Sequence, residues 1–194
     1  NHSPINLTGF IEADLTPIKF NYSAMVKEIL NNGHTVQVNL NSGSSIQLDG
    51  ISFDLLQFHF HAPSENHING KSYPLEAHFV HSDKAGNLAV VAVMFKQGSE
   101  SKGLMPAWQQ MPKHEGDMHK LKAKFNGMEI LPDNKDYYRF NGSLTTPPCS
   151  EGVRWLVMKT AVEASKQQIK AFSSVLHEPN NRPIQATNAR LILQ

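Results

Sequence analysis

A chain of 194 residues with a formal net charge of +1 is most simply one domain with a sizeable hydrophobic core. Because acidic and basic residues nearly cancel, the composition gives no reason to expect a nucleic acid or another polyanion as partner. The longest apolar run, Leu88–Phe95, is far shorter than the roughly 20 residues that cross a bilayer, so we expect no membrane span.

The predicted elements are mostly strands. Residues 1–21 are punctuated by Pro and Asn and should be extended, with turns following at residues 31–33 and 42–44. Leu88–Lys96 is continuously apolar, which is typical of a strand buried on both faces. In chain order, strands are predicted over His34–Leu40, Ser45–Leu48, Phe53–His61, Tyr73–His81, Leu88–Lys96, Tyr137–Gly142, Val153–Thr160 and Arg190–Gln194.

The helical signals are few. Ser165 and Gln168 fit a capping box, and Ile169, Phe172 and Leu176 then form one apolar stripe, so a helix is predicted here. Residues 98–135 mix Gly, Pro, Lys and Met and predict short helices and loops, with His114 and His119 exposed to solvent. Several strands with one clear helix indicate a mainly β (α+β) domain built on a large sheet.

Two of the predicted strands carry histidines at alternate positions. His59 and His61 share one face of Leu55–His61, and His78 lies on one face of Leu75–His81. If these strands pair antiparallel with their polar faces aligned, the three imidazoles converge. Three neutral imidazoles with one open position form the ligand set of a catalytic zinc site.

Neighbouring residues support this interpretation without deciding it. Gln57 and Glu76 each lie two residues from a histidine and can accept its second ring N–H, as partners of metal ligands usually do. A histidine on a strand face is nevertheless more often a structural residue, so the pattern alone leaves both interpretations open. His81 lies on the opposite strand face from His78 and His67 lies in a polar loop, so neither is predicted to bind the metal.

Longer motifs resemble a known family. The segments QFHFHAPSEN at 57–66, GKSYPLEAHFVH at 70–81 and GSLTTPPCSEGVRW at 142–155 resemble the α-class carbonic anhydrases, and the Ala-Pro-Ser-Glu-Asn continuation resembles their bacterial branch. Further similar stretches, NHSPINL, NNGH, LAVVAVMFK and NNRPIQ, follow in the expected order, so the resemblance covers nearly the whole chain. Family members usually have a further segment before the Ser-Pro-Ile motif, so residues 1–194 are expected to be a single catalytic domain truncated at its N-terminus.

The resemblance implies a fold and an activity. The fold would be a single domain on a large, mostly antiparallel, twisted central sheet with a few short peripheral helices. The activity would be the reversible hydration of carbon dioxide to bicarbonate and a proton through zinc-bound hydroxide, with Zn²⁺ as cofactor and weak hydrolysis of activated esters as a side activity. The alternative is a catalytically inactive relative used for binding. Such relatives typically lose a zinc ligand, whereas all three histidines are present here.

The resemblance also assigns roles to individual residues. Thr145 would accept a hydrogen bond from zinc-bound hydroxide because Glu65 takes the single proton of its hydroxyl, which orients the attacking oxygen. His34 would carry the released proton to solvent, and Gln37 would line the water path. The metal ligands would be His59, His61 and His78, their acceptors Gln57, Glu76 and a backbone carbonyl near Asn180, and the carbon dioxide site Val80, Val90, Leu144, Thr146, Val153 and Trp155.

The only cysteine, Cys149, suggests a compartment. In exported members of the family, a cysteine at this place typically pairs with one just upstream of the Ser-Pro-Ile motif. We therefore expect a periplasmic or secreted bacterial protein whose native form carries this disulfide. Because dimers are common in the bacterial branch, the resemblance also favours a homodimer.

Overall fold

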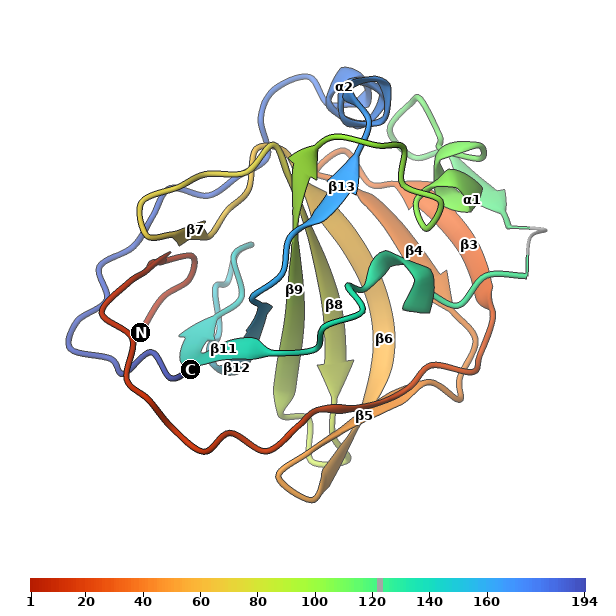
Figure 1. Cartoon of the computed structure of the whole chain (residues 1–194). Helices are drawn as coiled ribbons and strands as arrows, with labels where there is room; N and C mark the ends of the chain where they lie inside the picture. Colours follow the sequence, from red (N-terminus) through yellow and green to blue (C-terminus); the bar gives the residue numbers. More distant parts are fainter. Residues whose placement is uncertain (122–123) are drawn as a thin grey trace.

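One large, curved β-sheet forms the centre of the molecule (Figure 1). The computed structural model describes residues 1–121 and 124–194. Within them the elements are β1 (Asn6–Leu7), β2 (Lys19–Asn21), β3 (Val26–Asn31), β4 (Val36–Leu40), β5 (Ser45–Leu48), β6 (Ile51–His61), β7 (His67–Ile68), β8 (Leu75–Ser82), β9 (Leu88–Gln97), α1 (Met105–Trp108), β10 (Met118–Lys120), a 3₁₀ turn η1 (Met128–Ile130), β11 (Tyr137–Ser143), β12 (Glu151–Met158), β13 (Val162–Ala164) and α2 (Lys166–Val175).

The sheet is mixed but mainly antiparallel. In the described part of the chain it has eleven strands, whose main path runs β10-β3-β4-β6-β8-β9-β12-β11. Strands β12 and β13 both pair with β9 in parallel, and the other pairs of this sheet are antiparallel. The predicted fold class, a mainly β protein on a large and mostly antiparallel sheet with few short helices, is therefore confirmed.

The structure corrects some predicted boundaries. The strand predicted from His34 begins only at Val36, because the Asn32 side chain accepts the backbone N–H groups of His34 and Thr35 and holds them in a turn. The predicted strand Arg190–Gln194 is wrong, since only Leu193 there forms isolated bridges to other segments. The strand predicted over residues 153–160 runs from 151 to 158, and β3 was not predicted.

The pairing of β6 with β8 matches the prediction. The strands are antiparallel, with His59 directly opposite His78 and His61 opposite Glu76. A register shift between Leu55 and Gln57 precedes this stretch, so the alternation holds through the histidines. The polar side chains of both strands therefore lie on one face of the sheet.

Both faces of these strands pack into hydrophobic clusters. The face opposite the histidines contributes Phe58, Phe60 and Phe79 to one cluster, while Val80, on the same face as His78, belongs to a second cluster with Trp155. Residues 89–95 of β9 are buried throughout, as expected for a strand covered on both faces. This packing fixes the strands that carry the histidines.

Helix α2 covers one end of the sheet, as Figure 1 shows at the top. The predicted capping box is present, with Ser165 accepting from the N–H of Gln168 at 3.1 Å and the Gln168 side chain accepting from the N–H of Ser165. Phe172 on its buried face packs against Phe60 and Trp108. The helix thereby places the segment after residue 175 beside the end of β6 that carries His61.

His81 is buried on the apolar side of β8. Its Nδ1–H donates to the carbonyl of Ala89 at 3.2 Å, so its Nε2 is the atom that accepts the Tyr22 hydroxyl at 2.6 Å. Burial lowers the pKa of His81 to about 4, and the two hydrogen bonds fit only the neutral ring.

Acid should therefore destabilise the fold through His81. Since the folded pKa lies below the value of about 6.5 for a free histidine, the unfolded chain binds more protons between pH 6.5 and 4, and stability falls as the pH falls through this window. The loss attributable to this group is about 3 kcal/mol. Denaturant unfolding of the metal-free protein at several pH values should show a shallower pH dependence for His81→Gln than for the parent, and equal slopes would contradict the assignment.

Within the described residues, no helix combines the length and apolar character needed to span a membrane.

Candidate metal centre

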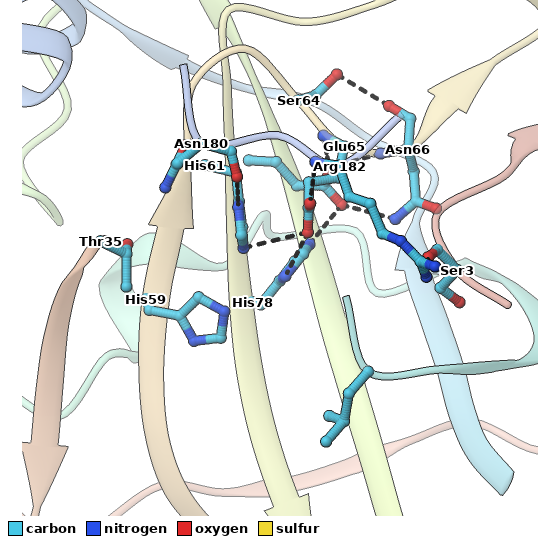
Figure 2. A network of polar contacts seen from close by, with 12 residues as sticks. Ser3, Thr35, His59, His61, Ser64, Glu65, Asn66, His78, Asn180 and Arg182 are labelled. Carbon is cyan, nitrogen blue, oxygen red and sulfur yellow. Dashed lines mark hydrogen bonds and ion pairs between the residues drawn. The ribbon is translucent and has the colours of Figure 1, made fainter. Parts of the chain in front are cut away.

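Three imidazoles converge on the polar face of the sheet. His59 and His61 project from β6 and His78 from β8, and their ring centroids lie 4.7 to 5.4 Å apart. One nitrogen of each ring lies within 4.8 Å of the corresponding atoms of the other two. Figure 2 shows the three rings pointing toward one shared space. The convergence predicted from strand alternation is thus present.

Each ring is oriented by an acceptor behind it. Gln57 Oε1 lies 2.8 Å from Nδ1 of His59, and Glu76 Oε2 lies 2.8 Å from Nε2 of His78. The third acceptor is the backbone carbonyl of Asn180, 3.0 Å from Nδ1 of His61. Because each of these ring nitrogens donates outward, the other nitrogen of each neutral imidazole is unprotonated and faces inward.

Burial favours the neutral form of two of these rings. It lowers the pKa of His59 well below its usual value, and it lowers the pKa of His61 to about 3, with the neighbouring imidazoles adding to the effect. For His78 burial also lowers the pKa, but the Glu76 carboxylate outweighs it, so the pKa is raised. Glu76 is therefore the anionic partner of this centre.

The Glu76 carboxylate is held by the loop that follows β6. Its Oε1 accepts the backbone N–H of Glu65 at 2.8 Å and that of Asn66 at 3.0 Å, and its Oε2 accepts the Asn66 amide at 2.9 Å. Burial raises the pKa of Glu76, but His78 and these hydrogen bonds lower it by a larger amount, so the net shift is downward. The carboxylate is therefore buried as a well-bonded anion.

Glu65 lies above the ligand rings. Its Oε2 accepts the backbone N–H of Arg182 at 2.7 Å, and its Oε1 lies 3.2 Å from Nε2 of His61 and 3.9 Å from Nδ1 of His78 (Figure 2). Burial raises the pKa of Glu65 to about 7, although His78, the Thr145 hydroxyl and the Arg182 N–H lower it. The role that the resemblance gives to Thr145 and Glu65 as a pair stays a prediction, supported by the effect of the Thr145 hydroxyl on the pKa of Glu65.

The donor set fits a divalent metal ion. Within residues 1–121 and 124–194, the buried atoms left without a hydrogen-bond partner are His61 Nε2 and Glu65 Oε1, and both face the shared space. Buried polar atoms without partners are rare in folded proteins. Three inward imidazole nitrogens match the open tetrahedral zinc geometry. A bound dication would satisfy His61 Nε2 and would favour the ionised form of Glu65.

A cavity of about 740 Å³ opens onto this centre. His59 and His61 lie on its wall, together with the predicted residues His34, Gln57 and Thr146. His34 is exposed and lies in the turn before β4. The cavity therefore connects the inward nitrogens with solvent.

The six residues predicted to hold carbon dioxide are divided between two places. Thr146 is exposed on the cavity wall, whereas the other five belong to the second hydrophobic cluster or pack against it. Trp155 lies with its ring centroid 4.9 Å from that of His78, so this cluster reaches the metal centre. The other cluster members among the six are Val80, Val90, Leu144 and Val153.

Sequence reasoning missed two contributors. It gave Arg182 no role in the site, but the backbone N–H of this residue donates to Glu65, while the Arg182 guanidinium donates to the carbonyl of Ser3 at 2.7 Å. It also missed Asn66, which holds Glu76. Neither has a local pattern that reveals it, since the backbone donor of Arg182 and the loop amide of Asn66 leave no mark in composition or periodicity.

Fold and site together define a class of protein: a metalloprotein with an open three-histidine centre on a large β-sheet. The family model of eukaryotic-type carbonic anhydrases matches residues 1–194, and the chain belongs to this family. The carbonic anhydrase of Pectobacterium atrosepticum is 49% identical to it over 193 residues, covering 100% of this chain and 79% of the relative.

Solved structures give the same result. The α-carbonic anhydrase from Thermovibrio ammonificans, solved in complex with the inhibitor sulfanilamide, aligns with a TM-score of 0.98 at 47% identity, covering 100% of this chain and 87% of that one. The α-carbonic anhydrase of Photobacterium profundum aligns with a TM-score of 0.96 at 49% identity, covering 100% and 89% respectively.

Proposed function

We propose that this protein is a zinc-dependent carbonic anhydrase that interconverts carbon dioxide with bicarbonate and a proton. The observation that carries the proposal is the set of three inward imidazole nitrogens, one of them a buried atom without a partner, at the end of an open cavity. Family membership supports the same activity. An inactive binding relative is disfavoured because the complete ligand set is present.

We infer the following roles for the residues of the site. His59, His61 and His78 would hold Zn²⁺, which supplies a Lewis acid that acidifies water at neutral pH. The Thr145 hydroxyl would donate its only proton to Glu65 and could then only accept from the attacking oxygen, which would fix the direction of attack. The cluster around Trp155 offers an apolar surface on which carbon dioxide would lie.

Two measurements on the purified protein test the proposal. Metal analysis should find one zinc ion per chain, and a stopped-flow assay should show carbon dioxide hydration that disappears after chelation and returns with zinc. A protein with zinc in this site but no hydration activity would contradict the enzymatic function.

His34 should control the proton-transfer step. His34→Ala is expected to lower kcat by about tenfold or more in dilute buffer while leaving kcat/KM for carbon dioxide nearly unchanged, because the shuttle acts after the chemical step. Added imidazole should restore much of the lost kcat. Equal losses in both constants without rescue would instead indicate a structural role.

We also propose export and a disulfide at Cys149. The half-buried thiol lies in the loop after Thr145, and the backbone nitrogen of Asn1 lies against the carboxylate of Glu151, two residues further on. A segment preceding Asn1 would thus pass close to Cys149, which supports the pairing with an upstream cysteine. Closing a loop of well over 100 residues would stabilise the fold by about 4–5 kcal/mol.

Mass spectrometry of the full-length, natively exported protein under non-reducing conditions should detect this disulfide. A free thiol at Cys149 in that material would overturn the assignment. The homodimer stays a prediction, which the molecular mass in solution would check.

A further inference from the structure

We propose that His177 is a second proton-transfer residue of this site, working in parallel with His34. The inference rests on the proposed function and extends it. His177 lies in the segment after α2 and lines the same cavity as His34 and the metal-site residues His59 and His61. Besides the metal-site histidines on β6, the cavity wall therefore has imidazoles on two further segments.

The position of His177 is fixed through Asn180. The carbonyl of Asn180 lies 3.0 Å from Nδ1 of His61, and its side-chain amide donates to the carbonyls of His34 and Phe60, both at 2.9 Å. Asn180 follows His177 by three positions, which limits their Cα distance to about 11 Å. The hydrogen bonds of Asn180 thus hold His34 and the ligand His61 in one region, and the short stretch of chain between His177 and Asn180 keeps His177 near them.

The ring of His177 is available for proton exchange. The residue is exposed, and within the described parts of the chain its ring makes no hydrogen bond. By contrast, exposed His119 is held by the carbonyl of Gln110 at 2.7 Å. The acidic neighbour Glu178 also lines the cavity, so the titratable groups around it are Glu178, His34, His59 and His61. An exposed imidazole without a hydrogen-bond partner can both accept and release a proton through cavity water.

The proposed step moves only a proton. After bicarbonate leaves, a proton from cavity water binds the unprotonated nitrogen of neutral His177 through intervening water molecules. The imidazolium then releases a proton from its ring to a buffer base in bulk solvent, which restores the neutral ring. No bond to carbon changes and no electron is transferred.

The test compares zinc-loaded variants His34→Ala, His177→Ala and the double variant in dilute buffer that lacks imidazole, with His114→Ala as a control that removes an exposed histidine elsewhere. We expect kcat to fall about tenfold in His34→Ala and about 100-fold in the double variant, the lower end of what positioned proton transfer contributes. kcat/KM should stay within about twofold throughout, and added imidazole should restore kcat in the double variant.

Each other outcome overturns the inference. If the double variant is as fast as His34→Ala, His177 carries no protons. If His177→Ala lowers kcat/KM or zinc content, or if imidazole fails to rescue the double variant, the residue acts structurally. Failure of the proposed function would appear separately, as a zinc-loaded parent protein that does not hydrate carbon dioxide.

Discussion

Replacing His78 with alanine is expected to abolish stoichiometric zinc binding and carbon dioxide hydration together. Two imidazoles remain, which is fewer than the three protein ligands of catalytic zinc sites. Because the metal supplies several kcal/mol of transition-state stabilisation, activity should fall at least about a thousandfold. The change also leaves the buried Glu76 carboxylate without its imidazole partner, and this should lower the free energy of unfolding by about 3 kcal/mol.

Zinc content, hydration rate and unfolding should be measured on the same preparation. His67→Ala is the matched control, since His67 lies half-buried on β7 outside the three-histidine cluster. Tight zinc binding with normal hydration in His78→Ala would show that the ligand assignment is wrong.

Thr145→Val should separate the chemistry from metal binding. The side chain keeps its shape but loses the hydroxyl that acts on Glu65 and that, on the proposed function, would orient the attacking oxygen. We expect kcat/KM for carbon dioxide to fall by about 100-fold while one zinc per chain is retained. Stopped-flow hydration at several carbon dioxide concentrations measures this constant directly.

The neighbouring residue supplies the control for this prediction. Thr146 is exposed on the cavity wall, so Thr146→Val should change kcat/KM much less than Thr145→Val does. Similar losses in the two variants would assign the effect to the polarity of the loop rather than to the Thr145 hydroxyl.

The part of the site built by neighbouring strands was predictable. Period-two alternation places His59 and His61 on one face, and pairing with the strand of His78 then requires only the antiparallel register that the structure shows. The acceptors Gln57 and Glu76 follow from the same period, because residues two apart on a strand point to the same side. A regular backbone converts sequence spacing directly into geometry.

The part contributed by irregular segments was not predictable from local patterns. The segment at residues 180–182 has no regular structure, and its carbonyl and N–H groups act through the backbone, which every residue possesses. The failed strand at 190–194 has a related cause. Its apolar residues suit a strand, but among them only Leu193 forms β-bridges, with Ile11 and Arg139.

The contacts of residues 180–182 also bear on how the protein is made. Strands β6 and β8, which carry the three histidines, are synthesised well before Asn180 and Arg182, which supply the acceptor for His61 and the backbone donor for Glu65. A nascent chain emerges from its N-terminus and can pair β6 with β8 before those residues are made. The three-histidine centre therefore reaches its final hydrogen bonding only after a segment made much later than the histidines has folded against it.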